Sequence, residues 1–260
     1  MSTFLFDEII FGPVASRRLG NSLGINLLPT DTKYCNFNCL YCECGLTAKN
    51  YATKRKDLPP RDLVKKELER TLNEFRNRHR RIDTITFAGN GEPTLHPEFA
   101  EIIDDTIVLK NIYFPNSKIA VLSNATLLGN EKIFRALYKV DYNILKLDSA
   151  FDDTLQKINC PLGNFSVSKL VAGLRKFPAN LTIQTLFVRG EYNGYFFDNT
   201  TDKEIDAWLE ILKELKPDLV MVYTIARDTP IDSIRKVEPE KLDEIARKVK
   251  ESGIPVTVSA

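Results

Sequence analysis

The sequence predicts an α/β fold, a single domain built as a partial (β/α)6 barrel of parallel strands. Short apolar runs rich in β-branched residues alternate with amphipathic helical stretches along the chain, and this alternation is typical of right-handed βαβ units. The 260 residues contain no repeat, low-complexity tract or Gly/Ser-rich linker that would divide them. A single α/β barrel of this length is ordinary.

Six apolar runs are predicted to be strands, and a seventh run ends the chain. Their near-continuous apolar character is typical of parallel strands buried on both faces. The runs are residues 24–28, 82–87, 118–122, 142–147, 181–187, 218–223 and 255–259. We expect residues 1–23 to form an N-terminal extension that leads into the first strand, and residues 24–260 to form the partial barrel. Six βα units are fewer than the eight of a closed barrel, so we expect it to stay open.

The helices between these runs have recognisable ends. Thr201 and Glu204 have the spacing of a capping box at a helix start. Pro217 stops that helix before the next strand. Gly253 follows the last helical stripe, where a left-handed residue commonly ends a helix.

Charge and cysteine usage narrow the class of protein. The 36 basic and 35 acidic residues leave a net charge of +1, which argues against a large nucleic-acid footprint. The N-terminus lacks the positive start of a secretory signal, and no run approaches the ~20 apolar residues of a membrane span. Four of the five cysteines fall within residues 35–44. Adjacent cysteines in a reducing compartment indicate metal binding, so we expect a cytoplasmic protein.

Three cysteines, Cys35, Cys39 and Cys42, have C-x3-C-x2-C spacing. Three thiolates on a four-iron cluster leave one iron without a protein ligand, and the amino and carboxylate groups of a methionine can chelate that iron. Two other interpretations stay open. A structural zinc site would need a fourth ligand such as Cys44, because zinc prefers four Cys or His ligands. The thiols can also be inert.

The cysteine loop, with Tyr41 before the third cysteine, resembles the signature of the radical S-adenosylmethionine (SAM) superfamily. Three later strand-end elements occur in the matching order. The resemblance implies an iron–sulfur oxidoreductase in which a 4Fe–4S cluster on the three cysteines cleaves SAM to a 5′-deoxyadenosyl radical that abstracts hydrogen from a substrate. It also implies an external electron donor, a flavodoxin or a ferredoxin.

The strand-end elements supply the expected cofactor contacts. The segment Gly89-Asn90-Gly91-Glu92 resembles the element that binds the methionine amino group, and an ordinary βα turn is the alternative. Ser123 and Asn124 are expected at a ribose hydroxyl or the methionine carboxylate, unless they are helix caps.

Further candidates lie on the later strands. Lys146 and Asp148 point to the same face and are candidates for a carboxylate partner and a ribose contact, with a structural ion pair as the alternative. Gln184 and Ile225 are weaker candidates, Ile225 beside the adenine; either can instead belong to the core or the substrate pocket.

Residues 11–20, the cysteines and the Gly-Asn-Gly-Glu-Pro-Thr element together look most like radical enzymes related to wyosine synthesis on transfer RNA. Archaeal wyosine-forming enzymes carry a second cluster on three further cysteines, whereas this chain has only Cys44 and Cys160 to spare. The near-zero net charge also does not supply the basic surface that a phosphate backbone needs. Transfer RNA is therefore a partner that the likeness suggests and the charge does not support.

The substrate stays open between a small molecule or nucleoside and, alternatively, a glycine of a partner protein that the chain would activate. A non-enzymatic iron–sulfur electron carrier or zinc-binding module is the third class. The two possible fates of SAM in the reaction, consumption as a co-substrate and regeneration as a cofactor, also stay open. Arg17 and Arg18 are candidates for binding an anionic substrate or tuning the cluster, unless their loop is simply solvated. Cys160 is a weak candidate for a hydrogen-atom relay, and a free thiol without a role is the alternative.

Overall fold

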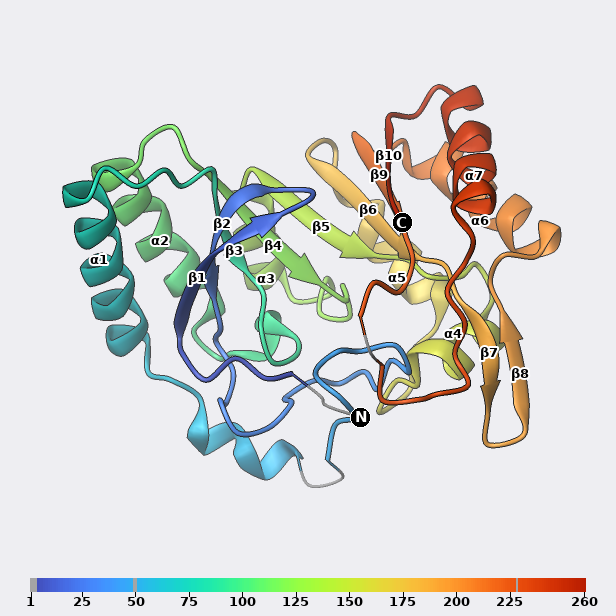
Figure 1. Cartoon of the computed structure of the whole chain (residues 1–260), viewed down its shortest axis with the longest axis horizontal. Helices are drawn as coiled ribbons and strands as arrows, with labels where there is room; N and C mark the ends of the chain where they lie inside the picture. The colour runs from blue at the N-terminus through green and yellow to red at the C-terminus, as the bar shows by residue number, and fades with distance from the viewer. Residues whose placement is uncertain (1–3, 49–50, 228) are drawn as a thin grey trace.

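The computed structural model describes residues 4–48, 51–227 and 229–260. An eight-stranded sheet curls into part of a barrel, with strand order β1-β2-β3-β4-β5-β6-β9-β10 (Figure 1). Strand β1 is antiparallel to β2, and every later neighbour in the sheet is parallel. The strands are β1 (Ile10–Ser16), β2 (Gly20–Ile25), β3 (Thr84–Phe87), β4 (Lys118–Ser123), β5 (Tyr142–Lys146), β6 (Leu181–Leu186), β9 (Leu219–Tyr223) and β10 (Val256–Ser259).

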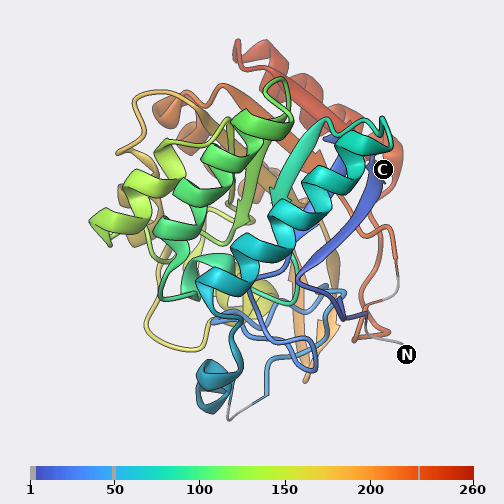
Figure 2. The same ribbon diagram turned by 90° about the vertical axis from the view of Figure 1, so that its left-hand side faces the viewer.

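Helices cover the convex face of the sheet, and Figure 2 shows α1, α2 and α3 side by side on one half of it. The face that α1 turns inward is apolar, with Val64, Leu68, Leu72 and Phe75 all buried. The helices are α1 (Arg61–Asn77), α2 (Phe99–Tyr113), α3 (Glu131–Tyr138), α4 (Asp152–Asn159), α5 (Val167–Leu174), α6 (Asp202–Leu215) and α7 (Pro239–Glu251), with short 3-10 turns η1 (Tyr51–Asp57) and η2 (Pro93–Leu95).

The predicted fold class is confirmed: seven parallel strands with intervening helices form an open, partial barrel. Six of the seven expected runs lie within two residues of the observed strands. The first was misplaced, because β2 spans Gly20–Ile25 instead of 24–28. Glycine and polar residues fill its first half, so the apolar run after it resembled the strand. Gly24 is needed there, since a Cβ would lie 2.1 Å from the Phe11 ring.

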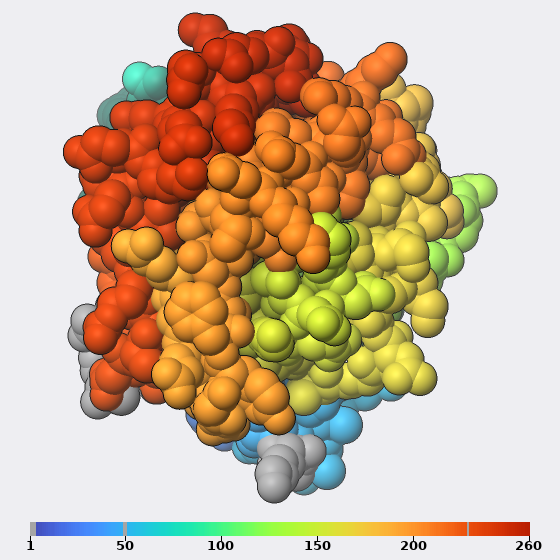
Figure 3. Space-filling model, turned by 90° about the vertical axis from the view of Figure 1, so that its right-hand side faces the viewer, coloured from blue at the N-terminus to red at the C-terminus, as the bar shows by residue number. Residues whose placement is uncertain are grey.

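The expected N-terminal extension is also partly wrong. Residues 10–16 form β1 at the edge of the main sheet, antiparallel to β2 with a register shift between Phe11 and Val14. A separate hairpin of β7 (Arg189–Tyr192) and β8 (Tyr195–Asp198) was not predicted either. In Figure 3 this orange hairpin lies against the yellow-green segment of α4.

The concave face of the sheet carries different side chains from the convex face. On β5, Leu145 belongs to the main core, as does Leu147 just after the strand, so Lys146 between them points to the other face. Gln184 and Tyr223 alternate with core residues in the same way on β6 and β9. A small apolar cluster lies on the concave face, made of Ala120, Ile144 and Met221 with Leu19, Leu122 and Leu219 packed against it.

Candidate active site

The loop that carries the cysteines packs on the end of β3. The Tyr34 amide donates to the Asn90 carbonyl at 2.8 Å, and the Glu92 amide donates to the Tyr34 carbonyl at 3.1 Å. This contact requires glycine, because a Cβ on Gly91 would lie 2.0 Å from the Tyr34 oxygen and φ there is +142°. Gly89 has φ +151°, and a Cβ there would lie 2.4 Å from the Asn26 side-chain oxygen. Gly91 therefore lets the cysteine loop approach the end of β3, and Gly89 lets the segment just after β2 approach it.

Asn90, between these glycines, is fully buried and serves the protein itself. Its side-chain amide donates to the carbonyls of Phe6 and Pro29, both at 2.8 Å, and its side-chain oxygen accepts from the Phe6 amide at 2.8 Å. Its backbone amide donates to Asn26. Since all of these polar groups are engaged within the chain, we correct the sequence-based interpretation of Asn90 as a cofactor contact.

Glu92 joins the ends of β3 and β4. Its carboxylate accepts from the Ser123 hydroxyl at 2.8 Å and from the Asn124 backbone amide at 2.7 Å. It also accepts from the backbone amide and the hydroxyl of Thr94. The carboxyl is buried; burial raises the pKa of Glu92, although these hydrogen bonds oppose the rise. We call Glu92, Thr94, Ser123 and Asn124 the Glu92 network.

The Glu92 network reaches the first cysteine through Asn124. The Asn124 side-chain amide donates to the Asn36 side-chain oxygen at 2.7 Å and lies 3.8 Å from the Cys35 sulfur. The Asn124 side-chain oxygen accepts from Thr126. Asn124 therefore orients the cysteine loop from the end of β4.

On the opposite side, the end of α4 holds the same loop. The Asn38 and Leu40 amides donate to the carbonyls of Asn159 and Ile158, both at 2.9 Å. Cys160 caps the helix in the left-handed conformation, with φ 42°, which turns the chain along the cysteine loop. No spacing pattern links this segment to the cysteines, so the sequence analysis named Cys160 but missed the contact of Ile158 and Asn159 with the cysteine loop.

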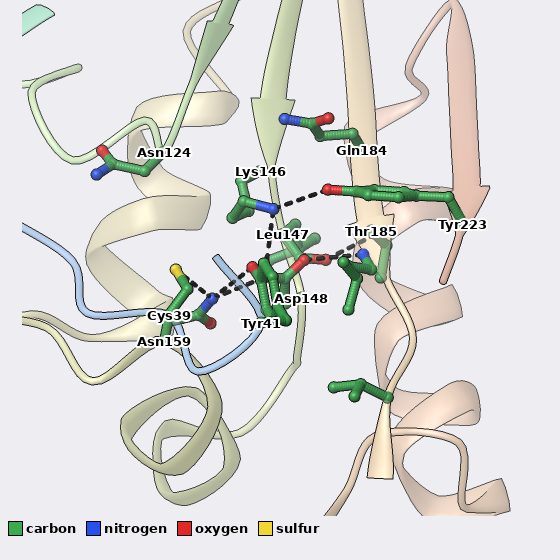
Figure 4. A network of polar contacts seen from close by, with 12 residues as sticks. Cys39, Tyr41, Asn124, Lys146, Leu147, Asp148, Asn159, Gln184, Thr185 and Tyr223 are labelled. Atoms are coloured by element: carbon green, nitrogen blue, oxygen red, sulfur yellow. Dashed lines mark hydrogen bonds and ion pairs between the residues drawn. The ribbon is translucent and has the colours of Figure 1, made fainter. Parts of the chain in front are cut away.

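Asn159 is the centre of a second polar network (Figure 4). Its side-chain amide lies 3.3 Å from the Cys39 sulfur, 3.0 Å from the Tyr41 hydroxyl and 2.7 Å from the Asp148 carboxylate. The Tyr41 hydroxyl also donates to Asp148. We call Asn159, Tyr41, Asp148 and Lys146 the Asp148 network.

The Asp148 side chain is completely buried and fully engaged. Besides the Tyr41 and Asn159 bonds, it accepts from the Leu186 amide at 3.0 Å and pairs with the Lys146 ammonium at 3.5 Å. A ribose hydroxyl has no exposed Asp148 oxygen to contact. The structure thus favours the alternative from the sequence, a structural ion pair, and gives Asp148 the role of positioning the cysteine loop.

Lys146 remains charged in this setting. Burial alone would lower the pKa of Lys146, but Asp148 and the Tyr223 hydroxyl at 3.1 Å outweigh it, and the net shift is upward. The ammonium also lies 5.1 Å from the Tyr41 ring centroid.

A residue that the sequence analysis missed is Lys33, two positions before Cys35. It is buried, and its ammonium donates to the Gly45 carbonyl at 2.9 Å. Burial lowers the pKa of Lys33, yet the sulfurs of Cys42, Cys35 and Cys39 around it raise it overall. A lysine two residues before the first cysteine of the motif was the available signal. All three thiols therefore interact electrostatically with one ammonium group.

The positions of the metal-binding side chains can be compared with the needs of a zinc ion and of an iron–sulfur cluster. In the described ranges, no group of three or more His, Cys, Asp or Glu side chains is placed to hold a single metal ion. A cubane needs no such common point, because each thiolate binds a different iron. The Cys44 thiol instead donates to the Gly89 carbonyl at 3.4 Å. Cys44 also lies beside Cys42, and its side chain lowers the pKa of Cys42 to about 5. Cys35, Cys39 and Cys42 are therefore the cysteines that the loop offers to a cluster, whereas Cys44 bonds to Gly89.

Cys160 lies beside the loop but not in it. Its thiol donates to the Lys157 carbonyl at 3.4 Å, and burial raises the pKa of Cys160 to about 11. It lines a cavity of about 340 Å³ between α4 and the hairpin, together with Tyr192 and Phe197.

Ile225, just after β9, lines a larger cavity of about 540 Å³ that also includes Arg227 and Ile231. Ile225 packs against the buried cluster that contains Cys39 and Tyr41. The cavity therefore adjoins the cysteine loop.

A half-barrel with a three-cysteine loop across its strand ends defines a class of radical enzymes. The family model described as the Radical SAM superfamily matches residues 30–192, and the chain belongs to this superfamily. It is 30% identical over 247 residues to a UPF0026 protein of Methanocaldococcus jannaschii, an alignment that covers 92% of this chain and 69% of that protein.

Other similar proteins are longer than this chain. The GTPase Obg of Brachyspira hyodysenteriae is 31% identical over 253 residues, which cover 96% of this chain and 34% of that protein, so the chain spans about a third of that relative. A radical SAM methyltransferase from Sphaerobacter thermophilus has a similar fold, with a TM-score of 0.68, 16% identity, and coverage of 92% of this chain and 65% of the other. Streptococcus suis SuiB bound to S-adenosylmethionine also has a similar fold, with a TM-score of 0.62 and 16% identity. The match covers 92% of this chain and 52% of the SuiB chain.

Membership of the superfamily makes the chain a radical SAM enzyme with a 4Fe–4S cluster and SAM as cofactors. Enzymes of this superfamily generally need an external electron donor. The non-enzymatic interpretation is therefore wrong. Among the helices that the structure describes, none combines the length and the hydropathy that a membrane crossing requires.

Proposed function

We propose that the chain cleaves SAM reductively and uses the resulting 5′-deoxyadenosyl radical to take a hydrogen atom from a small-molecule or nucleoside substrate on the concave face of the sheet. The observation that carries this proposal is the loop of Cys35, Cys39 and Cys42, which backbone hydrogen bonds hold against the ends of β3 and α4, with the buried Lys33 ammonium bonded to the Gly45 carbonyl of the same loop.

The residues around the cysteines prepare them to hold the cluster. The Lys33 ammonium balances negative charge on the three thiolates. Asn124 and Asn159 place one amide each near Cys35 and Cys39, and such contacts tune an iron–sulfur centre. When bound, the cluster and SAM supply the radical chemistry; the protein supplies placement and shielding.

For SAM, we propose that the methionine end lies where β3 and β4 end, beside Glu92, Ser123 and Asn124, and that the adenine lies in the cavity lined by Ile225. The ends of neighbouring parallel strands meet at one edge of a sheet, and in α/β folds ligands bind outside these ends. The cavity adjoins the loop that holds Cys39, which supports a continuous site from cluster to adenine.

We also propose a flavodoxin or ferredoxin as the electron donor and a cytoplasmic location. All five cysteines are free thiols, as is typical of a reducing compartment. The likeness to wyosine-related enzymes, and with it transfer RNA, stays a prediction. The alternative of a glycyl-radical activase also stays a prediction. Hydrogen abstraction from a protein, in place of a small molecule, would support this alternative.

Anaerobic reconstitution with iron and sulfide, reduction with dithionite and addition of SAM test the proposal. We expect 5′-deoxyadenosine from the wild-type protein and none from Cys39→Ala. A wild-type protein with a filled, reduced cluster that releases no 5′-deoxyadenosine would refute it.

A further inference from the structure

The turn between β1 and β2 sends its two arginines to different places. The exposed Arg17 donates to the Ala260 carbonyl at 2.7 Å and so ties the turn to the end of the chain. The half-buried Arg18 instead donates to the Gln184 side-chain oxygen at 3.3 Å, and its guanidinium lies 4.9 Å from the Tyr223 ring centroid. Arg18 therefore reaches the concave face at β6 and β9.

A second cation lies beside the same tyrosine. The Lys146 ammonium is 5.6 Å from the Tyr223 ring centroid and 3.1 Å from its hydroxyl. Both cations thus share one aromatic ring, on the face where Lys146 and Gln184 are register partners in neighbouring strands.

The acceptors on this face do not balance the donors. Asp148 is the carboxylate that pairs with Lys146, and it also accepts from Tyr41, Asn159 and the Leu186 amide. Throughout the described residues, no carboxylate pairs with Arg18, and the Gln184 side-chain nitrogen has no hydrogen-bond partner. Two cations and a free amide therefore face one carboxylate that is already engaged.

The surroundings are partly apolar and only partly open to water, so an acceptor that binds to these donors would be held more strongly than in bulk water. Leu19, adjacent to Arg18, packs on the apolar cluster of Ala120, Ile144 and Met221. Gln184 is buried, and 13% of the Lys146 side chain is exposed. Charges and amide donors that are withdrawn from water in such a setting are normally paired. An anionic oxygen group can accept from the guanidinium, the amide and the ammonium together, and charge-assisted bonds of this kind are strong.

We propose that Arg18, Gln184 and Lys146 bind an anionic group of the substrate, a carboxylate or a phosphate, on the concave face of the sheet. The proposal rests on the proposed function, because it assigns this group to the molecule that gives up hydrogen. It names a substrate class, and it distinguishes Arg18 from its neighbour Arg17.

The test measures anion binding to cluster-loaded protein by isothermal titration calorimetry at constant ionic strength, with inorganic phosphate and, separately, acetate as probes. SAM is present throughout, so that the cofactor site is filled. Arg18→Gln removes the charge, Arg18→Lys retains it, and Arg17→Gln is the matched control. Cluster absorbance and 5′-deoxyadenosine release from the wild-type protein are recorded in parallel.

We expect one probe or both to bind the wild type and Arg17→Gln equally, with affinity at least about tenfold weaker in Arg18→Gln, as for the loss of one charge-assisted hydrogen bond. Arg18→Lys should retain part of the affinity, because it keeps the positive charge. If Arg18→Gln fails to fold, the comparison of Arg18→Lys with the wild type measures the contribution of the Arg18 guanidinium. Preference for phosphate or for acetate identifies which anion the substrate carries.

Three results would overturn the proposal. The first is that the wild type binds no anion, and the second is that Arg17→Gln and Arg18→Gln bind it equally. The third is anion binding that appears only when SAM is left out, because the donors would then belong to the site of the SAM carboxylate. Each is distinct from failure of the proposed function, which shows as a wild type that releases no 5′-deoxyadenosine.

Discussion

The two polar networks at the strand ends touch the same loop but differ in charge. The Glu92 network surrounds its carboxylate with neutral donors and ends at Cys35 through Asn124. The Asp148 network pairs its carboxylate with the Lys146 cation and ends at Cys39 through Asn159. The first holds its carboxylate with neutral groups only, beside the proposed position of the methionine end of SAM. The second continues to Tyr223 and Arg18, where donors outnumber acceptors, and so faces a ligand.

This comparison presupposes that both networks serve one cluster on three cysteines. Cys39→Ala should therefore abolish both the cluster and SAM cleavage, because one of three ligands is lost. Cys44→Ala and Cys160→Ala are matched controls that should retain the cluster. Iron content and absorbance of the reconstituted proteins are the measurement, and loss of iron in Cys44→Ala would contradict a three-cysteine site.

The next largest effect should separate the two carboxylates. Asp148→Asn leaves the Lys146 ammonium buried without its counter-charge, so we expect the free energy of unfolding to fall by about 3 kcal/mol. Glu92→Gln strands no cation and turns one acceptor into a donor, at a cost of about 2 kcal/mol. Urea unfolding of the proteins measures both, with the exposed Asp243→Asn as control.

A double variant sharpens this result. Adding Lys146→Met to Asp148→Asn removes the unpaired charge, so the double variant should be more stable than Asp148→Asn alone. If the losses in unfolding free energy of Asp148→Asn and Lys146→Met simply add in the double variant, the Lys146–Asp148 ion pair is not the centre of the Asp148 network.

Lys33→Met should change the electronic properties of the cluster more than its occupancy. Removal of a buried positive charge beside the three thiolates disfavours the extra electron, so we expect a more negative reduction potential. A redox titration followed by electron paramagnetic resonance measures it, with the exposed Lys66→Met as control. An unchanged potential at full cluster occupancy would show that Lys33 only supports the fold of the loop.

The smallest effects should come from the two asparagines that touch sulfur. Asn159→Ala removes a contact of 3.3 Å to Cys39, whereas Asn124→Ala removes one of 3.8 Å to Cys35. Hydrogen bonds weaken with distance, so the potential should become more negative in Asn159→Ala and change less in Asn124→Ala. Asn130→Ala, a helix cap on α3, is the control that lowers stability alone. The reverse order of shifts would contradict the geometry.

The sequence predicted the parallel strands because their apolar runs are local. It also predicted the cysteines, because their spacing is local. It placed Glu92, Asn124 and Asp148 at strand ends but not their hydrogen-bond partners. Whether a buried carboxylate serves a ligand or the protein depends on groups such as Asn159, which lies 120 positions from Cys39. Strand β2 was misplaced because glycine, asparagine and serine occupy its first positions.

The most direct test of the account is the electron paramagnetic resonance spectrum of the reduced cluster, recorded on the wild type and on Cys44→Ala with and without SAM. An iron left free by three cysteines should change the spectrum of both proteins when SAM binds, at unchanged iron content. A spectrum that SAM leaves unaltered in the fully loaded wild type would contradict the central claim.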